Sequence, residues 1–330
     1  MEGLVIWGAG AVGGLLGAWL ARRGHDPLMV DVVPEHVAAM RAGGLRVVGT
    51  REPFTQPVRA ALPEEVEGPL DTVILAVKCH HTEAAIAQVA SLLSPRGVVV
   101  SFQNGLNENV IGAAVGRERT LGAFINYSAT WKGPGEVEHG GEHPIYVGEL
   151  DGAMTPRLTA IQRMLSDFEE TIATDNIWGY LWSKTVYGCL LSATALVDED
   201  IPDLLRERGV GPILYRLVRE AMAVPDRLGV RLEPFGGFSP EAYRKSEWRP
   251  AIEGVARFYA AQVQRRTGVW RDLAIRHRKT EIDCHAGALA RQGRELGLDM
   301  ARVERLVALM HAAEEGRPRR LENIAALERA

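Results

Sequence analysis

The strongest constraint on the fold of this chain is a glycine-rich turn that directly follows an apolar run near its start. Leu4–Trp7 leads into Gly8-Ala9-Gly10-Ala11-Val12-Gly13, and an apolar segment then continues to Gly24, where a helix would end. This order of strand, GxGxxG and helix is typical of a turn that binds a dinucleotide. Gly8 permits the tight turn, Gly10 lets backbone approach a pyrophosphate, and Gly13 lets the helix pack closely on the strand. The exposed amides at the start of the helix would bind the phosphates.

The same segment has to be distinguished from a membrane span. Residues 4–21 carry no charge and are long enough to resemble a membrane span. Glycines crowd its centre, no basic region precedes it and no small-residue cleavage site follows, so we expect neither a membrane helix nor a signal peptide.

Length and composition restrict the remaining classes. At 330 residues the chain exceeds what one hydrophobic core usually covers, so we expect two domains. The net charge of -4 with mixed signs gives no reason to expect a nucleic-acid partner. The three cysteines are far apart and form no CxxC pair, which favours a reducing, cytoplasmic location and no metal site.

Alternating strands and helices follow the glycine turn. Residues 28–30, 71–77 and 97–102 are short apolar runs typical of buried parallel strands, and a helical pattern over 82–93 separates the last two. This βαβ alternation predicts an α/β fold with an open, doubly wound sheet of the Rossmann type. Residues 121–147 contain shorter extended pieces, which we interpret as extra strands at the sheet edge.

The second half of the chain has a different pattern. From about residue 176 strands disappear, and periodic segments predict an all-α domain. These segments cover residues 177–197, 211–228, 240–266, 279–296 and 301–315. Thr174-Asp175 can begin a helix, so we place the boundary there: a dinucleotide-binding domain over 1–174 and a domain for substrate and dimerisation over 175–330. Its apolar helix faces suggest a homodimer.

Asp31 bears on the choice of cofactor. It ends the second strand about 20 residues beyond the glycine turn, where an acidic side chain accepts hydrogen bonds from ribose hydroxyls. A carboxylate there would repel the 2′-phosphate of NADP, so the sequence favours NAD(H), with NADP(H) as the alternative. An aspartate that only caps the following loop is the competing interpretation. Arg41 or Arg46 could instead reach a phosphate.

Polar residues follow two further strands at their carboxyl ends. Lys78 comes directly after residues 73–77, and Asn104 follows the strand that ends at Phe102. Ligands bind at this end of the strands in open α/β sheets, although each residue alone could be an ordinary loop residue.

In the helical half, Lys184 lies inside an otherwise apolar segment. A surface lysine is one interpretation. If the helix is buried on most sides, the lysine pKa falls from about 10.4 toward neutrality, and the amine becomes a usable general acid. Gly188 and Ser192 follow on the same helix face, where small side chains leave room for a ligand. Glu281 could orient the lysine, hold a substrate hydroxyl, or simply be a carboxylate at a helix N-terminus.

Taken together, these residues resemble the ketopantoate reductase (2-dehydropantoate 2-reductase) family along nearly the whole chain. The matching pieces are the glycine turn, Ala76-Val77-Lys78, Gln103-Asn104-Gly105, Leu181-Trp182-Ser183-Lys184 with Cys189 behind it, and Thr280-Glu281-Ile282-Asp283. The resemblance implies a Rossmann domain and an all-helical domain like the C-terminal domain of 6-phosphogluconate dehydrogenase. It also implies that Lys184 is the general acid and that Glu281 contacts the ligand. Asn104 would then lie at the nicotinamide and the substrate carbonyl, with Lys78 beside the cofactor.

The chain departs from the family's pattern at several positions. The family commonly has asparagines where this chain has Gly188 and Ser192, and an Asn-Gly pair where it has Ala286-Gly287. A polar substrate group that loses its hydrogen bond in the site loses about 1 to 3 kcal/mol of binding free energy. These departures therefore bear on which substrate is bound more than on the type of reaction. The family also tends to carry an arginine for NADP at or beside the position of Asp31.

We therefore expect a cytoplasmic oxidoreductase that uses NAD(P)H to reduce a small 2-oxo acid in the cleft between its domains. Ketopantoate, in pantothenate biosynthesis, is the first candidate substrate. The expected catalytic residues are Lys184, Glu281 and Asn104, and those expected to contact substrate are Gly188, Ser192 and Arg271. The alternatives are a related dehydrogenase for another 2-hydroxy acid or an amino-acid-derived substrate, and a nucleotide-binding sensor without turnover.

Overall fold

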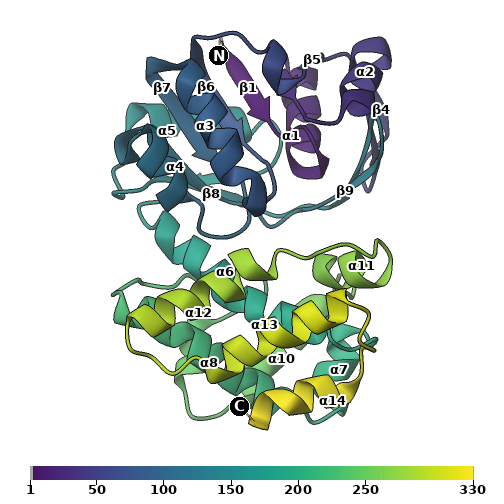
Figure 1. The fold of residues 1–330 in the computed structure, drawn as a ribbon, viewed down its shortest axis with the longest axis vertical. Coiled ribbons are helices and arrows are strands. Elements are labelled where there is room, and N and C mark those ends of the chain that lie inside the picture. The colour runs from purple at the N-terminus through teal and green to yellow at the C-terminus, as the bar shows by residue number, and fades with distance from the viewer. Residues whose placement is uncertain (1–2, 263, 330) are drawn as a thin grey trace. The chain divides into compact units, whose positions relative to one another are not determined.

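The computed structural model describes residues 3–262 and 264–329 and divides into two compact units, Met1–Ile177 and Trp178–Ala330 (Figure 1). The first unit is built on two sheets, and the second is built of helices.

In the described part of the first unit, eight strands form one sheet in the order β12-β11-β8-β7-β6-β1-β2-β5. Neighbouring strands are parallel except β8 and β11, which are antiparallel. This confirms the predicted doubly wound sheet of the Rossmann type. The strands in spatial order are β12 (Thr171–Ala173), β11 (Ile145–Glu149), β8 (Thr120–Phe124), β7 (Leu93–Ser101), β6 (Leu70–Leu75), β1 (Leu4–Trp7), β2 (Leu28–Val30) and β5 (Arg59–Ala61).

Both faces of this sheet are buried at its centre, which explains why β1 and most of β6 are apolar. Leu4 and Ile6 of β1 belong to one hydrophobic core, whereas Val5 and Trp7, which point to the opposite face, belong to another. The helices that contribute to the first core are α1 (Ala11–Arg22), α2 (Pro34–Gly43) and α5 (Pro156–Leu165), and those of the second are α3 (Thr82–Leu92) and α4 (Glu108–Val115).

A second sheet covers α1 on the side away from β1 (Figure 1). Four described strands form it in the order β4-β3-β10-β9: β4 (Phe54–Gln56), β3 (Leu45–Gly49), β10 (Glu136–Gly141) and β9 (Ser128–Gly133). The expectation that residues 121–147 add strands to the edge of the main sheet is wrong for β9 and β10. Instead β10 pairs with β3 and β9 pairs with β10, and the local sequence pattern carries no signal for a partner as distant as β3.

The second unit is helical, as predicted. Its helices are α6 (Ile177–Thr194), α7 (Ile201–Glu207), α8 (Gly211–Arg227), α9 (Pro240–Arg244), α10 (Arg249–Ala260), α11 (Gly268–Ala274), α12 (Ala286–Glu295), α13 (Ala301–Glu314) and α14 (Leu321–Ala325). The apolar face of α8 is buried, and α8 packs against α10, α12, α13 and α14.

Two of the predicted helical segments are wrong in extent. Residues 240–266 contain two helices, because Lys245 is extended and Pro250 lies in the first turn of a new helix, α10. Residues 279–285 precede α12 instead of forming its first turns, and they contain the 3₁₀ turn η4 (Ile282–Cys284).

Candidate active site

The glycine turn between β1 and α1 has the geometry expected of each of its glycines. Gly8 has a φ of +99°, which glycine adopts without strain. A Cβ on Gly13 would lie 2.1 Å from the carbonyl oxygen of Gly8, so α1 can start this close to the strand only with glycine there. A Cβ on Gly10 would meet no atom of the described residues within 4 Å, so the space beside Gly10 is open.

Backbone hydrogen bonds hold the turn against β2. The amides of Gly8 and Ala9 donate to the carbonyl oxygen of Val30 at 2.8 and 2.9 Å. Further on, the amide of Gly14 donates to the carbonyl oxygen of Gly10 at 2.8 Å, while the first amides of a helix have no partner within it. An open surface beside such amides fits the pyrophosphate of a dinucleotide, and the turn that would hold it is Gly8, Ala9, Gly10, Ala11, Val12 and Gly13.

Asp31 directly follows β2 close to this turn, and one of its oxygens caps the start of the next loop. Oδ1 accepts a hydrogen bond from the amide of Val33 at 3.1 Å, as the capping interpretation expects. Oδ2 has no partner among the described residues, so it remains available to a ribose hydroxyl. The two interpretations of Asp31 are therefore compatible.

The two arginines that could have reached a phosphate are engaged elsewhere. Arg41 donates to the carbonyl oxygen of Ala60 at 2.9 Å and pairs with both carboxylate oxygens of Glu65. Arg46 lies 3.6 Å from the carboxylate of Glu136. Each arginine thus has a carboxylate partner within the first unit.

Lys78 and Asn104 lie at the same edge of the main sheet as the glycine turn. They follow β6 and β7, which are parallel neighbours, and β6 in turn pairs with β1. Lys78 is exposed and Asn104 is partly buried. The structure thus brings the predicted cofactor residues of the first unit to one edge of one sheet.

A chain of hydrogen bonds that the sequence did not reveal links these two loops. The amide group of Gln103 donates to the carbonyl oxygen of Val77 and to the Thr82 hydroxyl, both at 2.8 Å. The Thr82 hydroxyl donates to Asn107 Oδ1 at 3.2 Å, and Asn107 Nδ2 donates to the carbonyl oxygen of Asn104 at 2.8 Å. In the sequence Thr82 and Asn107 look like ordinary helix-start residues, yet here they fix the backbone that carries Asn104.

Glu108, at the start of α4, is a second group that the sequence analysis missed. Its side chain is fully buried, and neither carboxyl oxygen makes a hydrogen bond of normal geometry to the described residues. Burial raises the pKa of Glu108 to about 7, while its own amide and the nearby Ser101 hydroxyl act in the opposite direction. A glutamate in the first turn of a helix is usually exposed, and its negative charge is stabilised there by the helix dipole. The sequence therefore gives no sign that Glu108 is buried.

Lys184 lies on the more open face of α6. Lys184 and Gly188 are partly buried, whereas the intervening Thr185 and Tyr187 are fully buried. Burial lowers the pKa of Lys184 to about 8, and the carboxylate of Glu281 opposes this fall. An amine with this pKa keeps its proton at neutral pH but releases it more readily than an ordinary lysine, as a general acid must.

Glu281 precedes the turn η4, so the prediction that it opens a helix is wrong. The amide and hydroxyl of Thr280 donate to Glu314 of α13 at 2.8 and 2.6 Å. The Thr280 hydroxyl also accepts a hydrogen bond from the amide of Ile282 at 3.3 Å, a local bond that competes with helix formation. These contacts hold the backbone at Glu281, whose carboxylate raises the pKa of Lys184.

The residues predicted to contact substrate differ in their surroundings. A Cβ on Gly188 would lie 3.8 Å from Nδ1 of His285, so an imidazole faces this glycine. His285, two residues after the Thr280–Asp283 motif, was not among the residues predicted from the sequence. Ser192 is buried, and Arg271 donates to the carbonyl oxygen of Arg266 at 3.2 Å. Substrate contact by Gly188, Ser192 and Arg271 stays a prediction.

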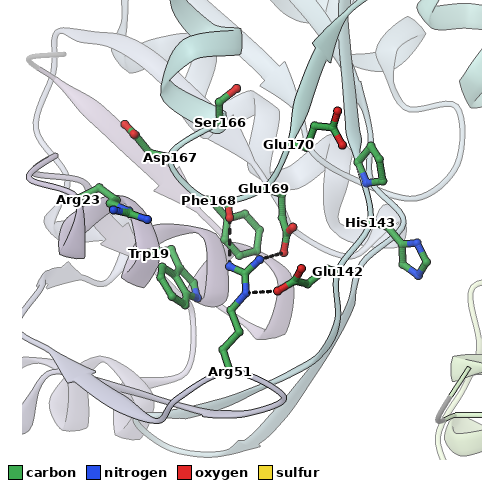
Figure 2. A pocket seen from close by; sticks show the side chains of 11 residues that line it. Trp19, Arg23, Arg51, Glu142, His143, Ser166, Asp167, Phe168, Glu169 and Glu170 are labelled. Carbon is green, nitrogen blue, oxygen red and sulfur yellow. Dashed lines mark hydrogen bonds and ion pairs between the residues drawn. The ribbon is translucent and has the colours of Figure 1, made fainter.

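A pocket of about 470 Å³ lies elsewhere in the first unit (Figure 2). Arg51 extends along it, packs 4.9 Å from the Trp19 ring, and donates to Glu142 at 2.6 Å and to Glu169 at 3.0 Å. Trp19 is nine residues along α1 from Gly10, roughly 13 Å by the rise of a helix. Among the described residues, those that line this pocket include none of the predicted site residues.

In residues 3–262 and 264–329, no group of three His, Cys, Asp or Glu side chains is placed to hold a metal ion. No helix in the described part of the chain has the length and apolar character needed to cross a membrane.

Two family models match this chain. The model for ketopantoate reductase PanE/ApbA matches residues 4–152, and the model for the C-terminal part of the same family matches residues 176–314. The chain belongs to the ketopantoate reductase family. This confirms the predicted family and, with it, the prediction of a nicotinamide-dependent oxidoreductase that acts on a CH–OH group.

Individual members of the ketopantoate reductase family are similar along almost their whole length. The 2-dehydropantoate 2-reductases of Mesorhizobium japonicum and Archaeoglobus fulgidus are each 28% identical, over 95% and 94% of this chain and 98% and 97% of their own. A PanE/ApbA family ketopantoate reductase of Ralstonia eutropha has a TM-score of 0.80 at 26% identity, covering 94% of this chain and 98% of its own. D-mandelate dehydrogenase, solved with NADH and anilino(oxo)acetate, has the same fold, with a TM-score of 0.81 at 22% identity over 94% of this chain and 98% of its own.

Proposed function

We propose that this protein reduces a small 2-oxo acid to the 2-hydroxy acid, with ketopantoate as the first candidate substrate. The observation that carries the proposal is the environment of Lys184 in a chain of the ketopantoate reductase family. Burial lowers the pKa of Lys184 to about 8, and the carboxylate of Glu281 opposes this fall. In this proposal residues 1–174 bind the cofactor, and residues 175–330 provide the proton and contacts to the substrate.

The cofactor supplies the hydride, and the chain supplies the proton. Lys184 Nζ holds a proton for the carbonyl oxygen of the substrate, on which negative charge develops during the reduction. The carboxylate of Glu281 favours the ammonium form, so Lys184 remains protonated at neutral pH although burial lowers its pKa. We assign Asn104 to the nicotinamide and the substrate carbonyl, and Lys78 to the cofactor.

NAD(H) is the cofactor that the residues at the end of β2 favour. Asp31 Oδ2 is available to accept from a ribose hydroxyl, and a carboxylate there disfavours a 2′-phosphate. Arg41 is paired with Glu65 and donates to the carbonyl oxygen of Ala60, and it would have to leave these partners to bind a phosphate. NADP(H) remains the alternative, and the relative rates with the two cofactors decide between them.

A related dehydrogenase for another 2-hydroxy acid is the second candidate. It is favoured by Gly188, which offers the substrate no side chain and has the imidazole of His285 opposite. D-mandelate dehydrogenase is an enzyme of the same fold whose structure holds NADH and a 2-oxo acid derivative. A third candidate, a nucleotide-binding sensor, would bind NADH without turnover.

Steady-state oxidation of NADH and of NADPH with ketopantoate and a panel of other 2-oxo acids tests the proposal. Fast turnover of ketopantoate supports a ketopantoate reductase in pantothenate biosynthesis. Activity with another acid alone supports the second candidate, and binding without any turnover supports the sensor. A cytoplasmic location and a homodimer are further parts of the proposal, and light scattering of the purified protein tests the second of these.

A further inference from the structure

We propose that His36 is a positioning residue that holds the peptide between Ala9 and Gly10 in the orientation needed to bind the pyrophosphate of the cofactor. The inference rests on the proposed binding of a dinucleotide at the glycine turn, and it assigns a role to a residue outside that turn.

His36 lies in the first turn of α2 and is 1% exposed. Its Nε2 lies 2.9 Å from the carbonyl oxygen of Ala9, and its Nδ1 lies 2.9 Å from the amide nitrogen of Gly135. A carbonyl oxygen only accepts and an amide only donates, so these two partners place the hydrogen on Nε2 and leave Nδ1 as the acceptor. The imidazole therefore connects the glycine turn to the hairpin between β9 and β10.

The hydrogen bond to Ala9 fixes which way the following peptide faces. In a trans peptide the C=O and the N–H point in opposite directions, so holding the Ala9 oxygen toward α2 points the Gly10 amide away from it. The space beside Gly10 is open, since a Cβ there would meet no described atom within 4 Å. In this orientation the turn presents an N–H group, and not a carbonyl oxygen, to an anionic ligand.

Glycine makes this peptide easy to reverse, which is why it needs holding. Gly10 has no Cβ and tolerates both signs of φ, so it offers little steric resistance to rotation of the preceding peptide. The reversed peptide would bring a carbonyl oxygen toward a phosphate oxygen, and the two would repel. The preceding part of the turn is held separately, because Val30 O accepts from the amides of Gly8 and Ala9.

The second sheet orients the imidazole. Gly135 has a φ of +74°, and a Cβ on it would lie 3.0 Å from Cβ of Ala39, so the hairpin packs tightly against α2. The carbonyl oxygen of Gly135 accepts from the amide of Arg46 in β3 at 2.9 Å, which ties the hairpin to the rest of its sheet. The Gly135 amide can then donate to Nδ1 and set the plane of the ring.

Three substitutions at His36 separate its two hydrogen bonds. Glutamine places an amide nitrogen near the position of Nε2 and can still donate to Ala9. Asparagine is shorter and reaches only the position of Nδ1, so it can accept from Gly135 but cannot reach Ala9. Alanine removes both bonds. His139→Gln is the matched control, because His139 is also fully buried, lies in β10, and contacts Thr50 and Glu169 away from the glycine turn.

The dissociation constants of NADH and NADPH are measured by titration for each variant, together with the melting temperature without cofactor and the kcat at saturating cofactor. We expect the dissociation constant of the better cofactor to rise roughly fivefold to tenfold in His36→Ala and His36→Asn, the loss of about one hydrogen bond. We expect His36→Gln to restore binding to within about twofold of the wild type, and His139→Gln to leave it unchanged. The kcat should stay the same in every variant.

The result that overturns the inference is wild-type affinity in His36→Ala and His36→Asn, or failure of His36→Gln to restore binding. An equal loss of affinity in His139→Gln also overturns it, because the effect would then follow from general destabilisation. If the wild-type protein binds neither nucleotide, the proposed function fails together with the inference. Binding by the wild type with no effect at His36 defeats the inference alone.

Discussion

The carboxylate of Glu281 raises the pKa of Lys184, whereas burial lowers it. Burial lowers the pKa of Lys184 to about 8, and Glu281 limits that fall. Both residues belong to the second unit, where the contact of Thr280 with Glu314 holds the backbone next to Glu281. The protonation state of Lys184 therefore depends on a carboxylate that lies about a hundred residues further along the chain.

Glu281→Gln should move the pH dependence of the reduction toward lower pH. Without the carboxylate the ammonium form of Lys184 is less favoured, so its pKa falls below about 8 and less of the enzyme is protonated at pH 8. We expect kcat at pH 8 to fall roughly twofold to tenfold, with less loss at pH 6. A pH profile of kcat measures this. Asp283→Asn is the control, because Asp283 is exposed and pairs with His311; an unchanged profile in Glu281→Gln would contradict the coupling.

Substitution of two glycines in the turn should separate binding from folding. Gly10→Ala meets no described atom within 4 Å, so the variant should fold normally and bind the cofactor at least tenfold more weakly, because its methyl group occupies the space for the pyrophosphate. Gly13→Ala would place Cβ 2.1 Å from Gly8 O and should lower the melting temperature of the cofactor-free protein. Titration and thermal melting of both variants test this. Normal cofactor affinity in Gly10→Ala would remove the pyrophosphate from this position.

Asp31→Asn should change the choice of cofactor without disturbing α2. The amide oxygen of asparagine can still cap the amide of Val33, but the negative charge that opposes a 2′-phosphate is lost. We expect the ratio of kcat/KM for NADPH to that for NADH to rise roughly tenfold, equivalent to about 1.4 kcal/mol. Glu35→Gln, which removes an exposed carboxylate in the first turn of α2, should leave the ratio unchanged. An unchanged ratio in Asp31→Asn would place Asp31 away from the ribose.

Glu108→Gln should make stability less dependent on pH. The folded protein raises the pKa of Glu108 from 4.5 to about 7, so it binds more protons than the unfolded chain between these values, and wild-type stability falls as the pH rises through that range. The variant lacks this loss and should be more stable at pH 8 by roughly 1 to 3 kcal/mol. Urea unfolding at pH 5 and pH 8 checks the difference. If the stability of the wild type changes between pH 5 and pH 8 no more than that of the variant, Glu108 ionises as an exposed carboxylate does, which contradicts the prediction.

The sequence predicts the parts of the fold that local pattern determines. The turn from β1 into α1 follows from an apolar run, three glycines and a helix end, all within two dozen residues. The second sheet was missed because β3 pairs with β10 from about ninety residues away, and a short polar strand such as β10 has no apolar alternation to mark it.

The candidate site was predictable to a similar extent. Lys184 is visible as a charge within an apolar helix, and its lowered pKa follows from burial. The contacts of His36 and the burial of Glu108 depend on tertiary packing, and each residue looks in the sequence like an ordinary member of a first helical turn. The backbone at Glu281 depends on Glu314 of another helix, which explains why a helix was wrongly predicted there.

The most direct test of the central claim is the kcat of Lys184→Ala for reduction of the best 2-oxo acid, measured beside the wild type with saturating NADH or NADPH. If Lys184 donates the proton, kcat should fall about 10²-fold to 10⁴-fold while the dissociation constant of the cofactor and the circular dichroism spectrum stay unchanged. A variant that folds, binds the cofactor and retains wild-type kcat would contradict the assignment of Lys184 as the general acid.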